Sequence, residues 1–349
     1  MFSLLALVVG ASRKYVSLYL SRTSPPGTPA VRLSQDAKTL NNPNFFLSEA
    51  NHLAWLFNWP KAEPLYVRAE ELFKESGDTR DQIYARVGRI RAQSETMSYV
   101  EVSEMIGKEL NDPVVKNDPE LRLWCFAQKG YTDIEISPMA TKWDWSEARK
   151  IAKSLGETQW EARANGELGI IAFLQGNSRR AAKLVGDALL SAMASGDTGG
   201  QVRSLEMLGN GFNTVQRYAE AIRFFDRAIK IANSTPDAGF PYMAYEGKSQ
   251  TLIGQGKLKE ARDVLGQALT VAKDEDNLGH EAHILNLRGD LTLRTGDRDK
   301  AAGDLEEGSQ LALKYKYYRT AAEGMFDLAE LYLNVGDLRS AEKSATLGL

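Results

Sequence analysis

The sequence is poor in cysteine, histidine and net charge. Its 349 residues include a single cysteine, Cys125, which excludes an intrachain disulfide framework and leaves the cellular compartment open. Three histidines leave little material for acid–base chemistry. The 43 basic and 46 acidic residues give a formal net charge of −3, without the basic bias of a protein that tracks phosphates. We therefore predict no nucleic-acid partner.

Motifs for catalysis or metal binding are also lacking. His280 and His283 are three residues apart, whereas a metalloprotease helix needs a spacing of four and a third ligand, so we interpret them as an exposed helix start. Residues 254–257 (Gly-Gln-Gly-Lys) lack the Ser or Thr of a phosphate-binding loop. Cys125 has apolar neighbours and no adjacent cation, which predicts a buried, unreactive thiol. We expect no enzyme activity, no cofactor and no metal.

Long apolar runs are missing apart from a short one at the start. The run from Phe2 to Val9 is too short to span a bilayer, and Arg13 and Lys14 follow it, which is the wrong order for a signal peptide. A cytoplasmic location is favoured, and a signal peptide or short membrane anchor at residues 1–11 remains the alternative. Residues 24–29 (Ser-Pro-Pro-Gly-Thr-Pro) cannot continue a helix. We assign residues 1–45 to an N-terminal helix and a proline-rich linker, partly disordered.

What the chain does contain is a strict forty-residue repeat. Small residues recur at this interval after a turn at a fixed offset, and they are Ala181, Ala221, Ala261, Ala301 and Ala341. A fixed period of this length without insertions indicates a solenoid, in which each repeat is one supersecondary unit stacked on its neighbours. Such a chain presents an extended binding surface more often than a catalytic cleft.

Each repeat has the pattern of two helices. Leu205, Leu208 and Phe212 lie at helical spacing and form one apolar stripe. A second stripe follows the turn at Gln216 and consists of Tyr218, Ala221, Phe225, Ala228 and Ile231. Two helices joined by a short turn form an antiparallel hairpin, and strand-like alternation is scarce. The sequence therefore predicts an all-α fold.

The repeats resemble the tetratricopeptide repeats. The resemblance rests on Leu168-Gly169 and Leu208-Gly209 in first helices, on the glycine turns, and on small–large–small series such as Ala181/Val185/Ala188 and Ala221/Phe225/Ala228. The forty-residue period exceeds the usual thirty-four, which lengthens the helices by about 9 Å in total. Arg288 and Gln216 depart from the family pattern, where leucine and glycine are usual. The resemblance implies a right-handed α-solenoid whose first helices line a concave groove.

The repeat can be followed to both sides of its regular part. The small residues in the middle of successive first helices are spaced 38, 42, 39, 40, 40, 40 and 40 residues apart, and they are Ala50, Gly88, Gly130, Gly169, Gly209, Ser249, Gly289 and Ala329. We thus expect about eight helix-turn-helix repeats. Residues 46–156 form irregular, tryptophan-rich repeats, and residues 157–349 form regular ones, the last of them truncated. Residues 54–66 also resemble the repeat part of bacterial CHAT-type proteins.

The concave groove is the predicted partner-binding surface. Its residues lie opposite the packing stripes of the first helices, and they are Arg203, Glu206, Asn210, Asn213, Glu246, Gln250, Asn286, Asp290, Glu323, Asp327 and Glu330. One ladder runs from apolar through amide to acidic, in the order Ile170, Asn210, Gln250, Asp290, Glu330. Such a groove suits a neutral or basic protein or peptide. The alternative is a solvated surface without a partner.

Tryptophans define a second candidate surface. All six precede residue 161, where large rings fill gaps between unequal helices or anchor a partner. We interpret most of them as core residues, with Trp143 and Trp145 as candidate aromatic contacts.

Three functions remain open. The first is a non-catalytic scaffold that binds a protein or peptide in the groove. The second is a peptide-sensing regulatory repeat domain of a larger bacterial signalling or CHAT-type protein, and the third is a secreted or membrane-anchored assembly factor. Because the last repeat stops in mid-unit at Leu349, we also expect a homo-oligomer or a further C-terminal domain.

Overall fold

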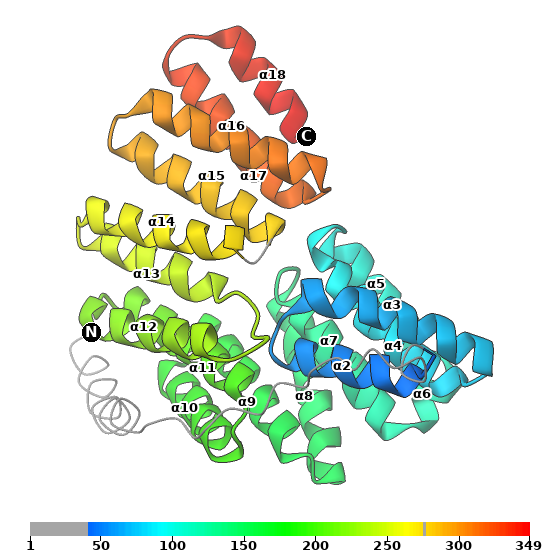
Figure 1. Cartoon of the computed structure of the whole chain (residues 1–349). Helices are drawn as coiled ribbons and strands as arrows, with labels where there is room; N and C mark the ends of the chain where they lie inside the picture. Colours follow the sequence, from blue (N-terminus) through cyan, green and yellow to red (C-terminus); the bar gives the residue numbers. More distant parts are fainter. Residues whose placement is uncertain (1–40, 275–276) are drawn as a thin grey trace.

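The structure is a computed structural model that describes residues 41–274 and 277–349. Residues 1–40 lie outside the described part. They include the apolar run at residues 1–11 and almost all of the predicted N-terminal helix and linker. Throughout the described part, all regular structure is helical (Figure 1). No helix in this part combines the length and the apolar character needed to cross a bilayer.

Eight helical hairpins are stacked along the described chain. The first helices are α2 (Pro43–Trp55), α4 (Thr79–Ala92), α7 (Pro119–Asp133), α9 (Thr158–Leu174), α11 (Thr198–Thr214), α13 (Tyr242–Gly254), α15 (Leu278–Arg294) and α17 (Tyr318–Asn334). The second helices are α3 (Trp59–Ser76), α5 (Tyr99–Glu109), α8 (Pro138–Leu155), α10 (Ser178–Ser195), α12 (Tyr218–Ser234), α14 (Leu258–Asp274), α16 (Arg298–Lys314) and α18 (Leu338–Gly348). A 3₁₀ turn, η1 (Gln93–Glu95), follows α4, and α6 (Pro113–Asn117) precedes α7. The predicted all-α solenoid is confirmed.

Glycines in the first helices allow the two helices of a hairpin to pack closely. A Cβ atom at Gly209 would lie 2.6 Å from the ring of Phe225 in α12, and one at Gly169 would lie 2.6 Å from the Val185 side chain in α10. Any side chain at these positions would hold the two helices apart. The small residues that mark the repeat in the sequence are therefore packing positions.

The turn after α11 explains one departure from the family pattern. Gln216 has a φ angle of 60°, in the left-handed region that glycine adopts at the corresponding Gly176, where φ is 77°. A residue with a Cβ atom is disfavoured there by roughly 1–2 kcal/mol. Backbone hydrogen bonds from Gln216 to Asn213 (2.8 Å) and from Arg217 to Phe212 (2.9 Å) close the turn in this conformation.

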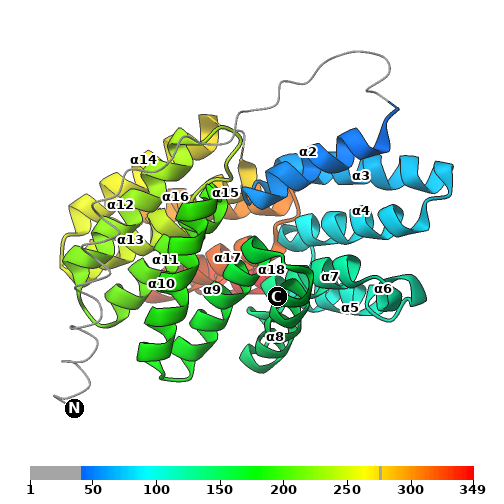
Figure 2. The same ribbon diagram turned by 90° about the horizontal axis from the view of Figure 1, so that it is seen from below.

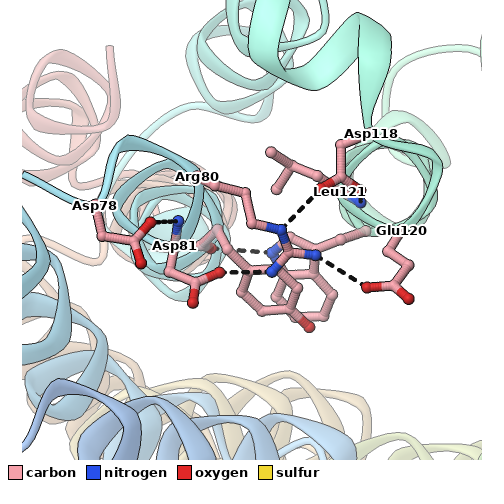
Figure 3. Close-up of polar contacts among 8 residues, drawn as sticks. Asp78, Arg80, Asp81, Asp118, Glu120 and Leu121 are labelled. Atoms are coloured by element: carbon pink, nitrogen blue, oxygen red, sulfur yellow. Dashed lines mark hydrogen bonds and ion pairs between the residues drawn. The ribbon is translucent and has the colours of Figure 1, made fainter.

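Large rings and ion pairs join the irregular hairpins at the N-terminal end. The ring of Trp124 in α7 stacks on that of Tyr84 in α4 at 4.7 Å, with 4° between their planes. Beside these rings, the guanidinium of Arg80 donates hydrogen bonds to Asp118 (2.8 Å) and Glu120 (3.0 Å) at the start of α7 (Figure 3). These contacts hold α4 against α7.

The array curves until its first hairpin meets later ones. The backbone N–H of Gly239, in the loop between α12 and α13, donates to the carbonyl of Leu56 (2.8 Å). The side chain of Asn58 donates to the carbonyl of Asp237 (3.1 Å). Figure 1 shows this loop reaching the turn between α2 and α3. We call the contact of residues 55–58 with Arg163, Gly199 and residues 237–239 the seam.

The curvature sets the early hairpins opposite the middle ones. Seen from below (Figure 2), α2–α7 and α9–α14 stand on opposite sides of the molecule. A further contact joins α5 to α17, where the guanidinium of Arg319 lies 4.6 Å from the ring centroid of Tyr99. The first helices thus face the inside of a strongly curved array.

Candidate functional site

Side chains forty residues apart form a row on successive first helices. We call Arg163, Arg203, Met243, His283 and Glu323 the inner row. The Arg203 guanidinium contacts the Met243 sulfur at 2.8 Å, and Nδ1 of His283 lies 3.5 Å from the Glu323 carboxylate. Because each member follows its neighbour by one repeat, the row runs along the array.

A buried ion pair anchors the middle of the inner row. Nε and Nη2 of Arg203 donate to the two oxygens of Glu167 in α9, at 2.9 and 3.1 Å. Burial by itself would lower the pKa of Arg203, but the Glu167 carboxylate outweighs this effect and raises it. The pair fixes α9 against α11 and keeps the Arg203 side chain beside the cavity described next.

An apolar cavity of about 280 Å³ opens between α9 and α11. Its deep wall includes the buried side chains of Val185 and Phe224, and Val215, which is 43% exposed, lies toward solvent. The remaining apolar lining consists of Ile134, Ile170, Phe173, Ala181, Ala182, Met207, Leu208, Phe212 and Met243. Arg203 and Asn210 are among its few polar neighbours. Small-molecule and peptide sites have this make-up, with apolar walls and a few polar groups that set orientation.

Glu206 is a buried acid next to this cavity. Burial raises its pKa to about 7, against the opposing effects of Arg203 and of the backbone N–H of Ala244. The carboxyl group therefore keeps its proton to a higher pH than an exposed glutamate does, and it is packed between α11 and α13 instead of lining an open groove. The prediction that Glu206 lies on the groove surface was wrong, since its side chain is 5% exposed.

Acidic side chains converge farther along the array, on α15 and α17. Burial, together with smaller contributions from the nearby carboxylates of Asp290, Glu330 and Glu323, raises the pKa of Asp327 to about 6. Asp290 is paired with Arg294 at 2.9 Å, so part of the negative charge is already balanced. We call Asp290, Glu323, Asp327 and Glu330 the acidic cluster.

The structure separates the other predicted groove residues. Asn286 is buried, and its Nδ2 donates to the carbonyl of Thr320 at 2.8 Å, so it joins α15 to α17 and does not face the groove. Gln250 is exposed and donates to Glu246 at 3.1 Å. Asn213 is half-buried at the end of α11.

The two candidate aromatic contacts have opposite environments. Trp145 is fully buried against Gly130, where a Cβ atom would lie 2.7 Å from the indole nitrogen, so its role as a partner contact was a wrong prediction. Trp143 is 58% exposed and packs edge-on against Phe126 at 5.2 Å. Only Trp143 is accessible to a partner.

The histidine pair is not an exposed helix start. The ring of His283 packs edge-on against Tyr242, its centroid 4.6 Å away, and the side chain is 18% exposed. Burial lowers the pKa of His283 to about 3, with smaller contributions from His280 and Arg319, so the ring is neutral at physiological pH. Within the residues that the structure describes, no three His, Cys, Asp or Glu side chains gather to hold a metal ion.

Sequence reasoning missed the cavity and the seam. The cavity combines residues from the end of α7 to α13, only some of which share the forty-residue spacing, and the seam joins segments more than a hundred residues apart. One signal was available, because Gly211 lies two residues after the packing position Gly209 and has no place in the repeat.

Neither a family model nor a curated protein sequence matches the chain. Solved structures with the same arrangement do exist. Rap protein in complex with competence and sporulation factor is 14% identical over 86% of this chain and 85% of its own, with a TM-score of 0.63. The apo form of the quorum sensor NprR from B. thuringiensis is 13% identical over 88% and 86%, with a TM-score of 0.56.

A third similar structure is a signal transduction ATPase with numerous domains, from Pyrococcus horikoshii, which carries a tetratricopeptide repeat sensor. It is 14% identical over 81% of this chain and 45% of its own, with a TM-score of 0.51. At these identities the likeness concerns the fold, and it confirms the expected repeat type. The resemblance to CHAT-type proteins is not confirmed.

Proposed function

We propose that this chain, which has the tetratricopeptide-type repeat fold, is a non-catalytic scaffold that binds a peptide segment along the inner face of its first helices. The observation that carries the proposal is the 280 Å³ apolar cavity beside the inner row, with Arg203 and Asn210 at its edge. Rap protein, with the same fold, was solved with competence and sporulation factor bound, which supports a ligand of this kind.

The charge of the groove favours a neutral or basic segment. Asn210 and Gln250 offer amide groups that can bond to a peptide backbone, and the acidic cluster lies farther along the same side. Burial and, to a smaller extent, the neighbouring carboxylates raise the pKa of Asp327, and a bound lysine or arginine would stabilise its charged form.

A peptide-display library tests this proposal. Random decapeptides are selected on the purified chain, and the enriched sequences are synthesised and titrated by fluorescence anisotropy. We expect enrichment of peptides that contain Lys or Arg. The variant Asp290→Lys/Asp327→Lys/Glu330→Lys should bind them at least tenfold more weakly, and more so at low salt.

A matched control reverses three acids elsewhere. Glu71, Asp187 and Glu260 lie exposed on second helices, and their change to Lys alters the net charge of the protein equally. This variant should keep wild-type affinity. Failure to enrich any sequence, or equal binding by the two charge variants, would contradict the proposal.

A second candidate function is regulation by a bound peptide. The seam favours it, because only a few hydrogen bonds hold the first hairpin to the middle of the array. A ligand bound between them would strengthen or break these hydrogen bonds. NprR, which shares the fold, is a quorum sensor. Small-angle scattering should then show a change in the radius of gyration when a selected peptide is added, and an unchanged curve would leave only the scaffold function.

A further inference from the structure

Two glycines in α11 have opposite surroundings. A Cβ atom at Gly209 would overlap the Phe225 ring, whereas a Cβ atom at Gly211 would have no atom within 4 Å. Glycine weakens a helix relative to alanine, so its presence without a packing reason is a cost to the fold. Gly211 lines the cavity, where the missing side chain keeps the space between α9 and α11 open.

The cavity has the size and lining of a side-chain receptor. Its volume of about 280 Å³ is nearly twice the roughly 150 Å³ of an engineered apolar cavity that admits benzene. Ile170, Phe173, Met207 and Met243 provide apolar walls, and the two methionines can adapt to different shapes. One aromatic or long aliphatic side chain fits this space.

The polar groups near the cavity point to a peptide as the occupant. Asn210 extends toward α13, since a Cβ atom at Gly247 would lie 2.9 Å from its Oδ1 atom. Gln250 on α13 and Asp290 on α15 follow Asn210 in the ladder. Asp290 belongs to the acidic cluster, which continues onto α17. An apolar site followed by amides and then by acids complements a chain with an apolar anchor and a cationic residue.

The spacing of the helices sets the spacing within the peptide. Packed helices lie about 8–10 Å apart, so the two steps from Asn210 to Asp290 span roughly 20 Å. An extended chain covers about 3.3 Å per residue, which corresponds to about six residues.

We propose that the cavity beside Gly211 receives an aromatic or long aliphatic side chain of the bound peptide, with a lysine or arginine about six residues away at the acidic cluster. This inference rests on the proposed function and specifies its ligand. It assigns to Gly211 the role of keeping the receptor open.

Variants at Gly211 test the inference directly. Gly211→Phe places a ring in the cavity, and Gly303→Phe is the matched control, because Gly303 in α16 does not line the cavity and a Cβ atom there also has no atom within 4 Å. Peptides selected on the wild-type chain should share an apolar residue with a basic one about six positions away. Changing that apolar residue to Ser, or Gly211 to Phe, should each weaken binding at least tenfold, and the two changes together should cost little more than one. Gly303→Phe should remain within threefold of wild type.

The possible outcomes separate the inference from the proposed function. Peptides that bind with no shared apolar residue, or that bind the Gly211→Phe variant as well as wild type, would overturn the inference while the scaffold function stands. If no sequence is selected, both fall. Circular dichroism checks that the Gly211→Phe variant is folded. If it is not, Ala182→Leu fills the cavity from α10 and takes its place, with the same expected loss of affinity.

Discussion

The guanidinium of Arg163 donates a 2.7 Å hydrogen bond to the main-chain carbonyl of Trp55, 108 residues earlier in the chain, and lies 3.6 Å from the centroid of its ring. The same guanidinium bonds both oxygens of Asp197, at 3.0 and 2.8 Å. One side chain in α9 thereby holds the first hairpin and the start of α11 together. The contact lies at one end of the inner row, of which Arg163 is the first member.

Removing the Arg163 side chain should loosen the seam. Arg163→Ala leaves Asp197 buried without its partner, which typically costs about 3–5 kcal/mol. Urea unfolding should show this loss, and the amide of Gly239, bonded across the seam to Leu56, should exchange with solvent faster. Lys183→Ala breaks an exposed pair with Asp187 and should cost less than about 1 kcal/mol. Similar losses in both variants would contradict a stabilising seam.

Alanine at Gly209 and at Gly211 in α11 should have effects of opposite sign. Gly209→Ala forces the buried Phe225 ring to move, and we expect a net destabilisation of up to about 2 kcal/mol after the gain in helix propensity. Gly211→Ala meets no atom and should stabilise the helix by up to about 1 kcal/mol. Thermal unfolding of the two variants measures the difference. Destabilisation by both would show that Gly211 has a structural role.

Glu206 should make stability depend on pH. Its pKa in the folded chain is about 7, above the ordinary 4.5, so the folded protein retains a proton that the unfolded chain has released between these values. The contribution to stability is complete below pH 4.5 and is lost as the pH rises through about 7. The shift corresponds to roughly 3 kcal/mol. In urea unfolding at pH 5 and pH 8, Glu206→Gln should reduce the pH difference by about this amount, and an unchanged difference would assign it to other groups.

Cys125 should react only after unfolding. The thiol is fully buried, and burial raises its pKa well above the usual range, so little thiolate is present or accessible. Labelling with a chromogenic disulfide reagent should be slow in the native protein and should reach one thiol per chain in denaturant. Rapid labelling under native conditions would mean that α7 opens locally. The apolar stretch around Cys125 predicted this environment from the sequence.

The hairpins could be predicted because their information is local. The forty-residue period, the small residues at Gly169 and Gly209, and the large ones opposite them are visible in the sequence, and the structure confirms the hairpins. The acidic residues at the end of the ladder could be found in the same way. Asn286 shares this spacing, but its position on the α15–α17 contact buries it. Periodicity identifies the face of a helix, whereas burial depends on how close the neighbouring helix comes.

By itself, the sequence determined the all-α hairpins, their stacking and the order of polar groups along the first helices, because each depends on residues within one or two repeats. The tertiary structure decided the seam, the cavity and the burial of Glu206. These features depend on small rotations between hairpins, which add up over the array until Trp55 reaches Arg163. The unequal early repeats and the long loop between α12 and α13 change those rotations. The total rotation over the array therefore cannot be predicted from any local sequence pattern.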